Sequence, residues 1–443
     1  MRILRSLYLR NPLFVLTGMN ALLFIIAFFF PIVLAPAKII FALIILLFII
    51  ELISLYRIRA GIFGERRVSE RLSNGDQNDI YISIENHYPY HVHISIIDEL
   101  PYQFQIRDFK IEGTLNNGDI KVFKYQLKPL KRGEYIFGGL NIYVRGAIGL
   151  ISRRYIFNQD KAVAVYPSFL QMRKYELHAI SNNLTDFGIK KIRKLGNNRE
   201  FEHIKEYVTG DDVRTINWKA TARRGGLMVN RFQDEKSQNV YCVIDKGRAM
   251  KMPFEGMTLL DYAINASLVI SNIALKKDDK AGLVTFSNSL ASFVQAQKKY
   301  THLNTILHVL YKEKTAYLES NNEILYLNLK QRVSQRSLIL LFTNFESLSS
   351  MRRQLPYLKL IASDHLLVTI FFKNTELEKL LHSKASDTEQ IYLKTIAEKF
   401  EFEKKLIVKE LQKYGIHSIL TSPQNLTVDT INKYLEIKSR NIL

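Results

Sequence analysis

The sequence is poor in the residues and motifs that carry most enzymatic chemistry. It contains one cysteine, Cys242, among 443 residues, which excludes an intrachain disulfide and a structural zinc site built from several cysteines. No Gly-Lys dipeptide occurs, so a P-loop nucleotide site is excluded. The metal-protease pattern HExxH, the hydrolase pattern GxSxG and a GxGxxG behind a strand are also missing. We therefore expect no catalytic residue, no cofactor and no enzymatic activity.

Acidic residues are outnumbered by basic ones. Lys and Arg number 62 and Asp and Glu number 42, which gives 62 − 42 = +20. The partners of such a surface are anionic: lipid headgroups, nucleic acid or an acidic protein. The cations are interleaved along the chain without a nucleic-acid-binding module, so we expect no nucleic acid partner. Runs such as 190–194 and Arg223-Arg224 keep open a binding module for anionic lipid or polymer at the inner membrane surface.

Two long apolar runs occupy the N-terminus, at residues 13–30 and 39–56. Each is long enough to cross a bilayer, and the short link between them predicts an antiparallel hairpin within a membrane anchor at 1–58, in contact with membrane lipid. A cleaved signal peptide is the alternative. Eight arginines flank the pair of runs and the link carries Lys38 alone, so the positive-inside rule predicts a multi-pass protein of the inner (cytoplasmic) membrane with its soluble domains in the cytoplasm.

The rest of the chain changes pattern twice. Residues 65–166 contain short runs rich in β-branched and aromatic residues between turn signals, which predicts a β-sandwich-like domain with a hairpin tip at 86–90. Residues 167–235 are expected to be a linker. From residue 236 to 443 strands and helices alternate, which predicts a doubly wound α/β domain whose ligands or partners bind at the carboxyl ends of the strands.

The linker carries the most specific motif in the chain, EYVTGDDVRTINWKATAR at 206–223. It resembles the diagnostic stretch of the domain-of-unknown-function 58 (DUF58) family, roughly REYxxGDDxRxIxWKxxAR, with Lys205 where the family commonly has the first Arg. The matching residues are Tyr207, Gly210, Asp211, Asp212, Arg214, Trp218, Lys219 and Arg223. The resemblance extends to the hairpin anchor and to an RGxY-type turn at 132–135. It implies a von Willebrand factor type A-like domain after the motif and a MoxR-type AAA+ ATPase as partner, in the assembly or maturation of other proteins.

The motif itself predicts a helix from Asp211 or Asp212 to about Arg224, ended by Gly225-Gly226. Asp211 and Trp218 lie within reach of Arg214, for an ion pair and a cation–π contact respectively. Three interpretations remain open: a structural clip between domains with a buried Trp218, a docking surface for a partner, and a catalytic site.

Metal-binding von Willebrand type A domains hold Mg²⁺ through DxSxS after the first strand, a Thr in a second loop and an Asp in a third. Here the corresponding stretch is Asp245-Lys246-Gly247-Arg248-Ala249, so both serines are missing, and Asn344 stands in place of an acidic ligand. Thr315 is only a candidate for the second loop. We therefore expect no metal, and an ion pair between Asp245 and a neighbouring cation. The rim of this degenerate site, with Lys246, Arg248, Asn344 and Glu346, becomes the expected docking surface.

Three functions follow from these features. The first is a membrane-anchored, non-enzymatic scaffold that presents docking surfaces to the ATPase and its client. The second is the anionic lipid or polymer binder. The third is an unrecognised hydrolase that uses Asp211, Asp212 and Asp245.

Overall fold

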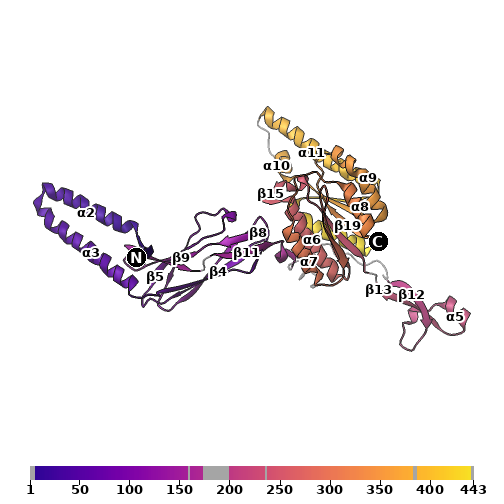
Figure 1. The fold of residues 1–443 in the computed structure, drawn as a ribbon, viewed down its shortest axis with the longest axis horizontal. Helices are drawn as coiled ribbons and strands as arrows, with labels where there is room; N and C mark the ends of the chain where they lie inside the picture. The colour runs from indigo at the N-terminus through magenta and orange to yellow at the C-terminus, as the bar shows by residue number, and fades with distance from the viewer. Residues whose placement is uncertain (1–4, 158–159, 173–198, 235–236, 383–386, 441–443) are drawn as a thin grey trace. The chain divides into compact units, whose positions relative to one another are not determined.

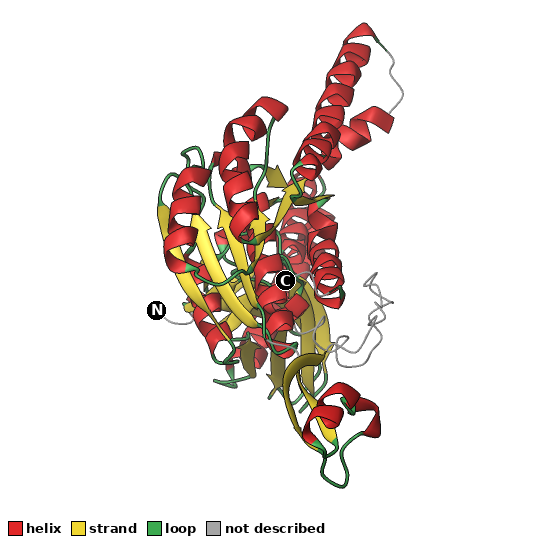
Figure 2. Cartoon of the chain, turned by 90° about the vertical axis from the view of Figure 1, so that its right-hand side faces the viewer, coloured by secondary structure: helices red, strands yellow, loops and turns green. Residues whose placement is uncertain are grey.

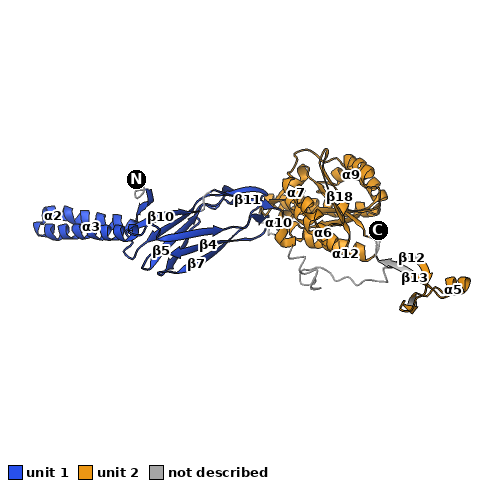
Figure 3. Ribbon diagram, turned by 60° about the horizontal axis from the view of Figure 1, so that its bottom comes forward, with its two compact units in different colours: residues 1–166 blue, residues 167–443 orange. Residues whose placement is uncertain are grey.

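The computed structural model describes residues 5–157, 160–172, 199–234, 237–382 and 387–440. The chain divides into two compact units, Met1–Tyr166 and Pro167–Leu443, coloured separately in Figure 3. Two apolar helices at the N-terminus and a sheet-rich α/β body confirm the multidomain layout. The basic run at 190–194 lies outside the described residues.

The N-terminal apolar runs form the predicted helical hairpin. Helix α2 (Asn11–Phe29) and helix α3 (Leu34–Tyr56) are joined by the 3₁₀ turn η1 (Pro31–Val33) and lie side by side in Figure 1. The rings of Phe24 and Phe41 meet edge to face across the hairpin, 6.2 Å between centroids. Both helices are long and apolar enough to cross a membrane, and only 17% of each apolar window is buried. The apolar side chains are therefore mostly exposed, unlike those of a core helix in a soluble protein.

The rest of the first unit is built from three antiparallel or mixed sheets. One has the order β1 (Leu7–Leu9), β10 (Ile151–Phe157), β9 (Leu140–Arg145), β5 (Val92–Asp98) and β6 (Ile111–Leu115). The second has β2 (Ile62–Arg67), β4 (Asn78–Asn86) and β7 (Ile120–Leu127), and the third has β3 (Arg71–Ser73), β11 (Lys161–Tyr166) and β8 (Gly133–Phe137).

Alternating side chains of the first two sheets fill one core. In β4 and β5 every second residue is buried, which places Ile82 and Ile84 of one sheet in the same cluster as Ile94 and Ile96 of the other. Strands β4 and β5 belong to different sheets, and the buried faces of these two sheets share this core. The predicted hairpin tip at 86–90 is wrong, because this segment carries the chain from one sheet to the other.

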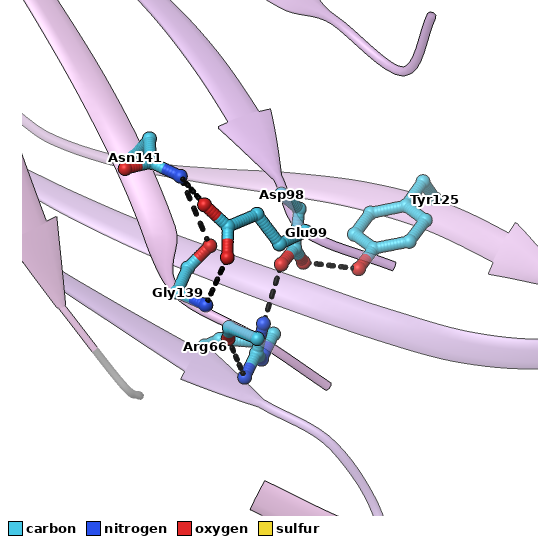
Figure 4. A network of polar contacts seen from close by, with 7 residues as sticks. Arg66, Asp98, Glu99, Tyr125, Gly139 and Asn141 are labelled. Atoms are coloured by element: carbon cyan, nitrogen blue, oxygen red, sulfur yellow. Dashed lines mark hydrogen bonds and ion pairs between the residues drawn. The ribbon is translucent and has the colours of Figure 1, made fainter. Parts of the chain in front are cut away.

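Polar groups also join these sheets, as Figure 4 shows. Arg66 of β2 forms a fully buried ion pair with Asp98 at the end of β5, and the Tyr125 hydroxyl of β7 donates to the same carboxylate. Arg66 Nη2 donates to the Gly138 carbonyl at 3.0 Å. A buried ion pair held by further hydrogen bonds specifies how the two sheets meet more than it adds to their stability.

The hairpin is attached to the β-sheets by a buried carboxylate. Glu51 of α3 is 2% exposed and accepts hydrogen bonds from the backbone amides of Gly149 (2.8 Å), Leu150 (2.8 Å) and Ile151 (3.2 Å). Arg153 of β10 donates to the carbonyls of Leu55, Ile58 and Arg59 at 2.6–2.8 Å and so satisfies acceptors at and just beyond the end of α3. Ahead of α2, strand β1 pairs with β10. Both ends of the hairpin are thus fixed to one sheet.

The second unit contains a six-stranded sheet of order β18 (Leu290–Gln297), β17 (Lys280–Phe286), β14 (Asn239–Asp245), β19 (Leu338–Phe342), β20 (Leu366–Phe372) and β21 (His417–Thr421). All neighbours are parallel except the edge strand β18, which the sequence pattern missed. In chain order the sheet reads 3-2-1-4-5-6, which is a doubly wound arrangement.

Helices cover both faces of this sheet, as Figure 2 shows. One face packs against α6 (Leu259–Lys276), α7 (His302–Lys312) and α12 (Leu426–Ser439), and the other against α8 (Asn322–Arg332), α9 (Leu348–Asp364) and α11 (Thr388–Lys413). Helix α10 (Thr375–His382) precedes α11, and a short hairpin of β15 (Pro253–Phe254) and β16 (Met257–Thr258) precedes α6. Thr258 and Asp261 form a capping box that fixes the start of α6.

The motif-bearing segment is a folded arm. Strands β12 (Arg199–Glu206) and β13 (Met228–Asp234) pair antiparallel, and the segment between them contains the 3₁₀ turn η4 (Val213–Thr215) and helix α5 (Trp218–Arg224). The expectation of a plain linker is therefore wrong for residues 199–234.

We expect Glu51→Ala to loosen the junction between hairpin and sheet, because it leaves three buried amide groups without their acceptor. Each unmet buried donor costs about 1–3 kcal/mol. Hydrogen exchange of the 149–151 amides in the detergent-solubilised chain should therefore accelerate on the order of 100-fold or more. Glu51→Gln keeps one acceptor oxygen and serves as the matched control with a smaller effect. Unchanged exchange in Glu51→Ala would contradict this role.

Candidate functional site

The candidate site lies where the doubly wound sheet changes direction. Strands β14 and β19 are neighbours, and the helices that follow them cover opposite faces of the sheet. Ligands of open α/β sheets bind at such a point, beyond the carboxyl ends of the strands. Asp245 is the last residue of β14, and Thr343 follows the last residue of β19.

Asp245 is buried, at 3% exposure, and its carboxylate is surrounded by neutral donors. Oδ1 accepts from the Gly247 amide at 2.8 Å and from the Ser320 hydroxyl, and Oδ2 accepts from the Thr343 hydroxyl at 2.7 Å. Burial raises the pKa of Asp245, while the hydrogen bonds from Ser320, Thr343 and Gly247 act in the opposite direction. The expected ion pair between Asp245 and a cation is wrong, since hydroxyl and amide groups take that place.

Ser320 reaches Asp245 because residue 247 has no side chain. A Cβ at Gly247 would lie 2.0 Å from Ser320 Oγ and 3.1 Å from Asp245 Oδ1. Ser320 precedes Asn321, the N-cap of α8, and no local pattern distinguishes it from Thr315 as the group that meets Asp245. A glycine two residues beyond a strand-end aspartate was the available signal that another group must approach closely there.

Lys246 is paired elsewhere and does not lie free on the rim. Its ammonium group is 2.8 Å from Glu313 Oε2, and its side chain is 17% exposed. Burial by itself would raise the pKa of Glu313, but hydrogen bonds from Lys246, Ser292 and Thr285 outweigh burial and lower the pKa. Lys246 is therefore engaged in a largely buried pair, and reversing its charge would break that pair, so the variant would not isolate its expected docking role.

The exposed charges beside Asp245 line a small cleft of about 60 Å³. Arg248, Glu346 and Arg353 are exposed there. Asn344 is half-buried, and its Oδ1 accepts a hydrogen bond from Lys404 at 2.8 Å. The described residues contain no group of three or more His, Cys, Asp or Glu side chains placed to hold a metal ion. Both Asp245 oxygens accept hydrogen bonds from neutral groups, and the exposed charges of the cleft belong to Arg248, Glu319, Glu346 and Arg353.

The motif residues form a second cluster, at the end of the β12–β13 arm. Asp211 accepts from Lys205 Nζ at 2.8 Å and from the Val208 amide at 3.0 Å, and Gly210 adopts φ 113°, in the region that favours glycine. Tyr207 donates its amide to the Leu227 carbonyl at 2.8 Å. These contacts close the turn that carries the motif.

The helix in the motif is shorter than predicted. It begins at Trp218, and its N-cap is Asn217, whose Oδ1 accepts from the Ala220 amide at 3.0 Å, rather than Asp211 or Asp212. Gly225 ends it in the left-handed conformation, as predicted. The side chain of Arg214 lies outside the described part of the chain, so its expected ion pair with Asp211 and its expected cation–π contact with Trp218 stay predictions. Trp218, Lys219 and Arg223 are exposed within this unit, so nothing in the unit itself buries the Trp218 ring, and its burial between domains stays a prediction.

Comparisons with known proteins support the DUF58 resemblance. Residues 203–393 match the model of the family described as "Protein of unknown function DUF58", a stretch that contains both the motif and the Asp245 cleft. "Uncharacterized protein YeaD" of Bacillus subtilis (strain 168) is 24% identical over 201 residues, which are 44% of this chain and 50% of that protein. The chain therefore spans about half the length of this curated relative.

Solved structures resemble parts of the chain weakly. The protein BatB from Bacteroides thetaiotaomicron is 12% identical and covers 46% of this chain and 100% of its own, with a TM-score of 0.31. The CARDB domain of the PF1109 protein from Pyrococcus furiosus is 11% identical and covers 24% and 93%, with a TM-score of 0.18. No argument about function rests on similarities of this size.

Trp218→Ala should change the free energy of unfolding by no more than about 0.5 kcal/mol, because exposed side chains contribute little to stability. Trp218 is the only tryptophan, and it is 69% exposed. Its emission should be red-shifted and readily quenched by acrylamide. Met228→Ala in β13, a buried position at 3% exposure, is the control and should cost about 2–5 kcal/mol. Blue-shifted, protected emission would show that another surface covers the ring.

Proposed function

We propose that this protein is a membrane-anchored, non-enzymatic interaction protein that docks a MoxR-type AAA+ ATPase through the Asp245 cleft. The observation that carries the proposal is that Asp245 accepts hydrogen bonds from Gly247, Ser320 and Thr343, while four charged side chains of the same cleft are exposed: Arg248, Glu319, Glu346 and Arg353. A strand order of 3-2-1-4-5-6 with an antiparallel third strand supports a von Willebrand factor type A-like domain. The DUF58 match supports the choice of ATPase.

Two of the three acidic groups weighed for hydrolysis, Asp245 and Asp211, are engaged in structural contacts. Asp245 accepts three hydrogen bonds, and Asp211 is paired with Lys205 and closes a turn. A general base needs a carboxylate within reach of a substrate proton. These contacts favour recognition over catalysis.

The proposal places the soluble units in the cytoplasm, at the inner membrane. Pairing of β1 with β10 supports retention of the first helix, because a signal peptide would remove a strand of the β-domain. We expect a reporter that is active only in the cytoplasm to function when fused at Leu443, and one that is active only outside to function at Lys38. The reverse pattern would refute the orientation and, with it, docking of a cytoplasmic ATPase.

Docking at the cleft predicts that Arg248→Glu combined with Arg353→Glu slows association with the cognate ATPase on the order of tenfold at low salt, because rim charges act mainly on the association rate. The control reverses two exposed cations at the opposite, amino edge of the sheet, Lys277→Glu with Arg336→Glu, for the same change in net charge. The association rate of the solubilised chain with the ATPase is measured for both double variants, with and without a non-hydrolysable nucleotide. Equal rates for both double variants would exclude the cleft as the docking site.

A further inference from the structure

The second unit contains a cavity that the proposed docking role does not use. Its volume is about 460 Å³, in the range of small-molecule sites. It lies beyond β20 and β21 and is enclosed by the β15–β16 hairpin, α10 and the first half of α11. The lining is mainly apolar and includes Phe254, Leu377, Leu380, Ile396, Ala397 and Phe400.

The spacing of residues on α11 places one cation at the end of this apolar wall. Leu393, Ile396, Ala397 and Phe400 recur at the spacing of one helix face, and Lys404 follows on the same face one turn later. Lys404 lines the cavity together with Asn344 and Glu346 at the carboxyl end of β19.

Lys404 is held by neutral groups. Its ammonium group donates to Asn344 Oδ1 at 2.8 Å and to the Phe345 carbonyl, and it lies 5.8 Å from the centre of the Phe371 ring, so these three contacts are all with uncharged groups. Among the ion pairs of the described residues none includes Lys404, whereas its neighbour Lys405 pairs with Glu401 at 2.7 Å. Burial lowers the pKa of Lys404 to about 8, opposed by Glu346. A desolvated cation of this kind is stabilised by a counter-charge brought into the same space.

We propose that this cavity binds a medium-chain fatty acid, with the acyl chain along the apolar face of α11 and the carboxylate paired with Lys404. Nucleotides and sugar phosphates, which carry several charged and hydroxyl groups, do not suit a lining whose surface is mainly apolar. The lining also holds Lys373, Lys405, Glu346, Glu376 and Glu401, of which Lys405 and Glu401 pair with each other at 2.7 Å. A single carboxylate on an apolar chain satisfies both the wall and the cation.

The test uses the full-length chain in detergent, with octanoate and decanoate as probes, octanol as the probe without a charge, and detergent alone as the blank. Calorimetric titration should show saturable binding of octanoate and weaker binding of octanol. Decanoate should bind more tightly than octanoate, by roughly three- to fourfold for each added methylene that the cavity still accommodates. No saturable binding above the blank would overturn the proposal.

Variants locate the two ends of the ligand. Lys404→Met should weaken octanoate at least tenfold and leave octanol unchanged, whereas Lys409→Met, at an exposed lysine of the same helix, should change neither. Ala397→Leu adds three carbon atoms at a fully buried wall position and should weaken both probes. Octanoate that binds Lys404→Met as tightly as wild type would refute the pairing, and unchanged binding to Ala397→Leu would refute the cavity.

The pH dependence provides a readout that a purely structural role of Lys404 would not give. With a pKa of about 8, Lys404 is mostly charged at pH 7 and mostly neutral at pH 9. Octanoate should therefore bind roughly tenfold more weakly at pH 9, octanol should not change, and Lys404→Met should remove the dependence. An octanoate affinity that is flat from pH 7 to pH 9 would contradict the carboxylate contact.

Discussion

The buried carboxylate of Glu51 joins the two kinds of structure in the first unit. An apolar helix and a β-sheet offer each other few complementary polar groups, but the loop before β10 presents three amide groups to this side chain. Arg153 completes the junction from the opposite direction by binding the carbonyls that the end of α3 leaves unsatisfied. Because β1 also pairs with β10, the chain enters and leaves the helical hairpin at the same sheet.

The second unit handles buried charge in three different ways within a short distance of one sheet edge. Asp245 is surrounded by hydroxyl and amide donors, Lys246 has a carboxylate partner in Glu313, and Lys404 contacts only neutral acceptors. A buried ion needs a partner or enough hydrogen bonds to replace water. Asp245 and Lys246 meet this condition internally, which makes them structural. Lys404 has uncharged contacts but no carboxylate partner among the ion pairs of the described residues, and it lines an apolar cavity. For this reason it is the group that we assign to a ligand.

Residue patterns predicted the elements whose side chains repeat regularly. The alternation of strands and helices after residue 236 is confirmed by elements such as the helix at Leu259–Lys276 and the strand at Leu366–Phe372, whose apolar periods are uninterrupted. The helical hairpin follows from two apolar runs with a short link. Asp245 was identified through the resemblance to metal-binding type A domains, in which an aspartate ends the first strand, and it is the last residue of β14. The edge strand β18 was missed, since its half-exposed residues lack a regular alternation.

The sequence by itself therefore determined the order of helices and strands, the apolar anchor and the aspartate at the strand end, because these depend on neighbouring residues. Only the tertiary structure decided which distant groups meet. Ser320 and Thr343 come to Asp245 from 75 and 98 residues away, and Glu313 reaches Lys246 from 67. Strands β4 and β5 separate into different sheets although they are adjacent in the chain. Trp218 stays exposed because its short helix packs no apolar face around it. Long-range contacts of this kind depend on how the sheets and loops pack together, and patterns among neighbouring residues do not predict that packing.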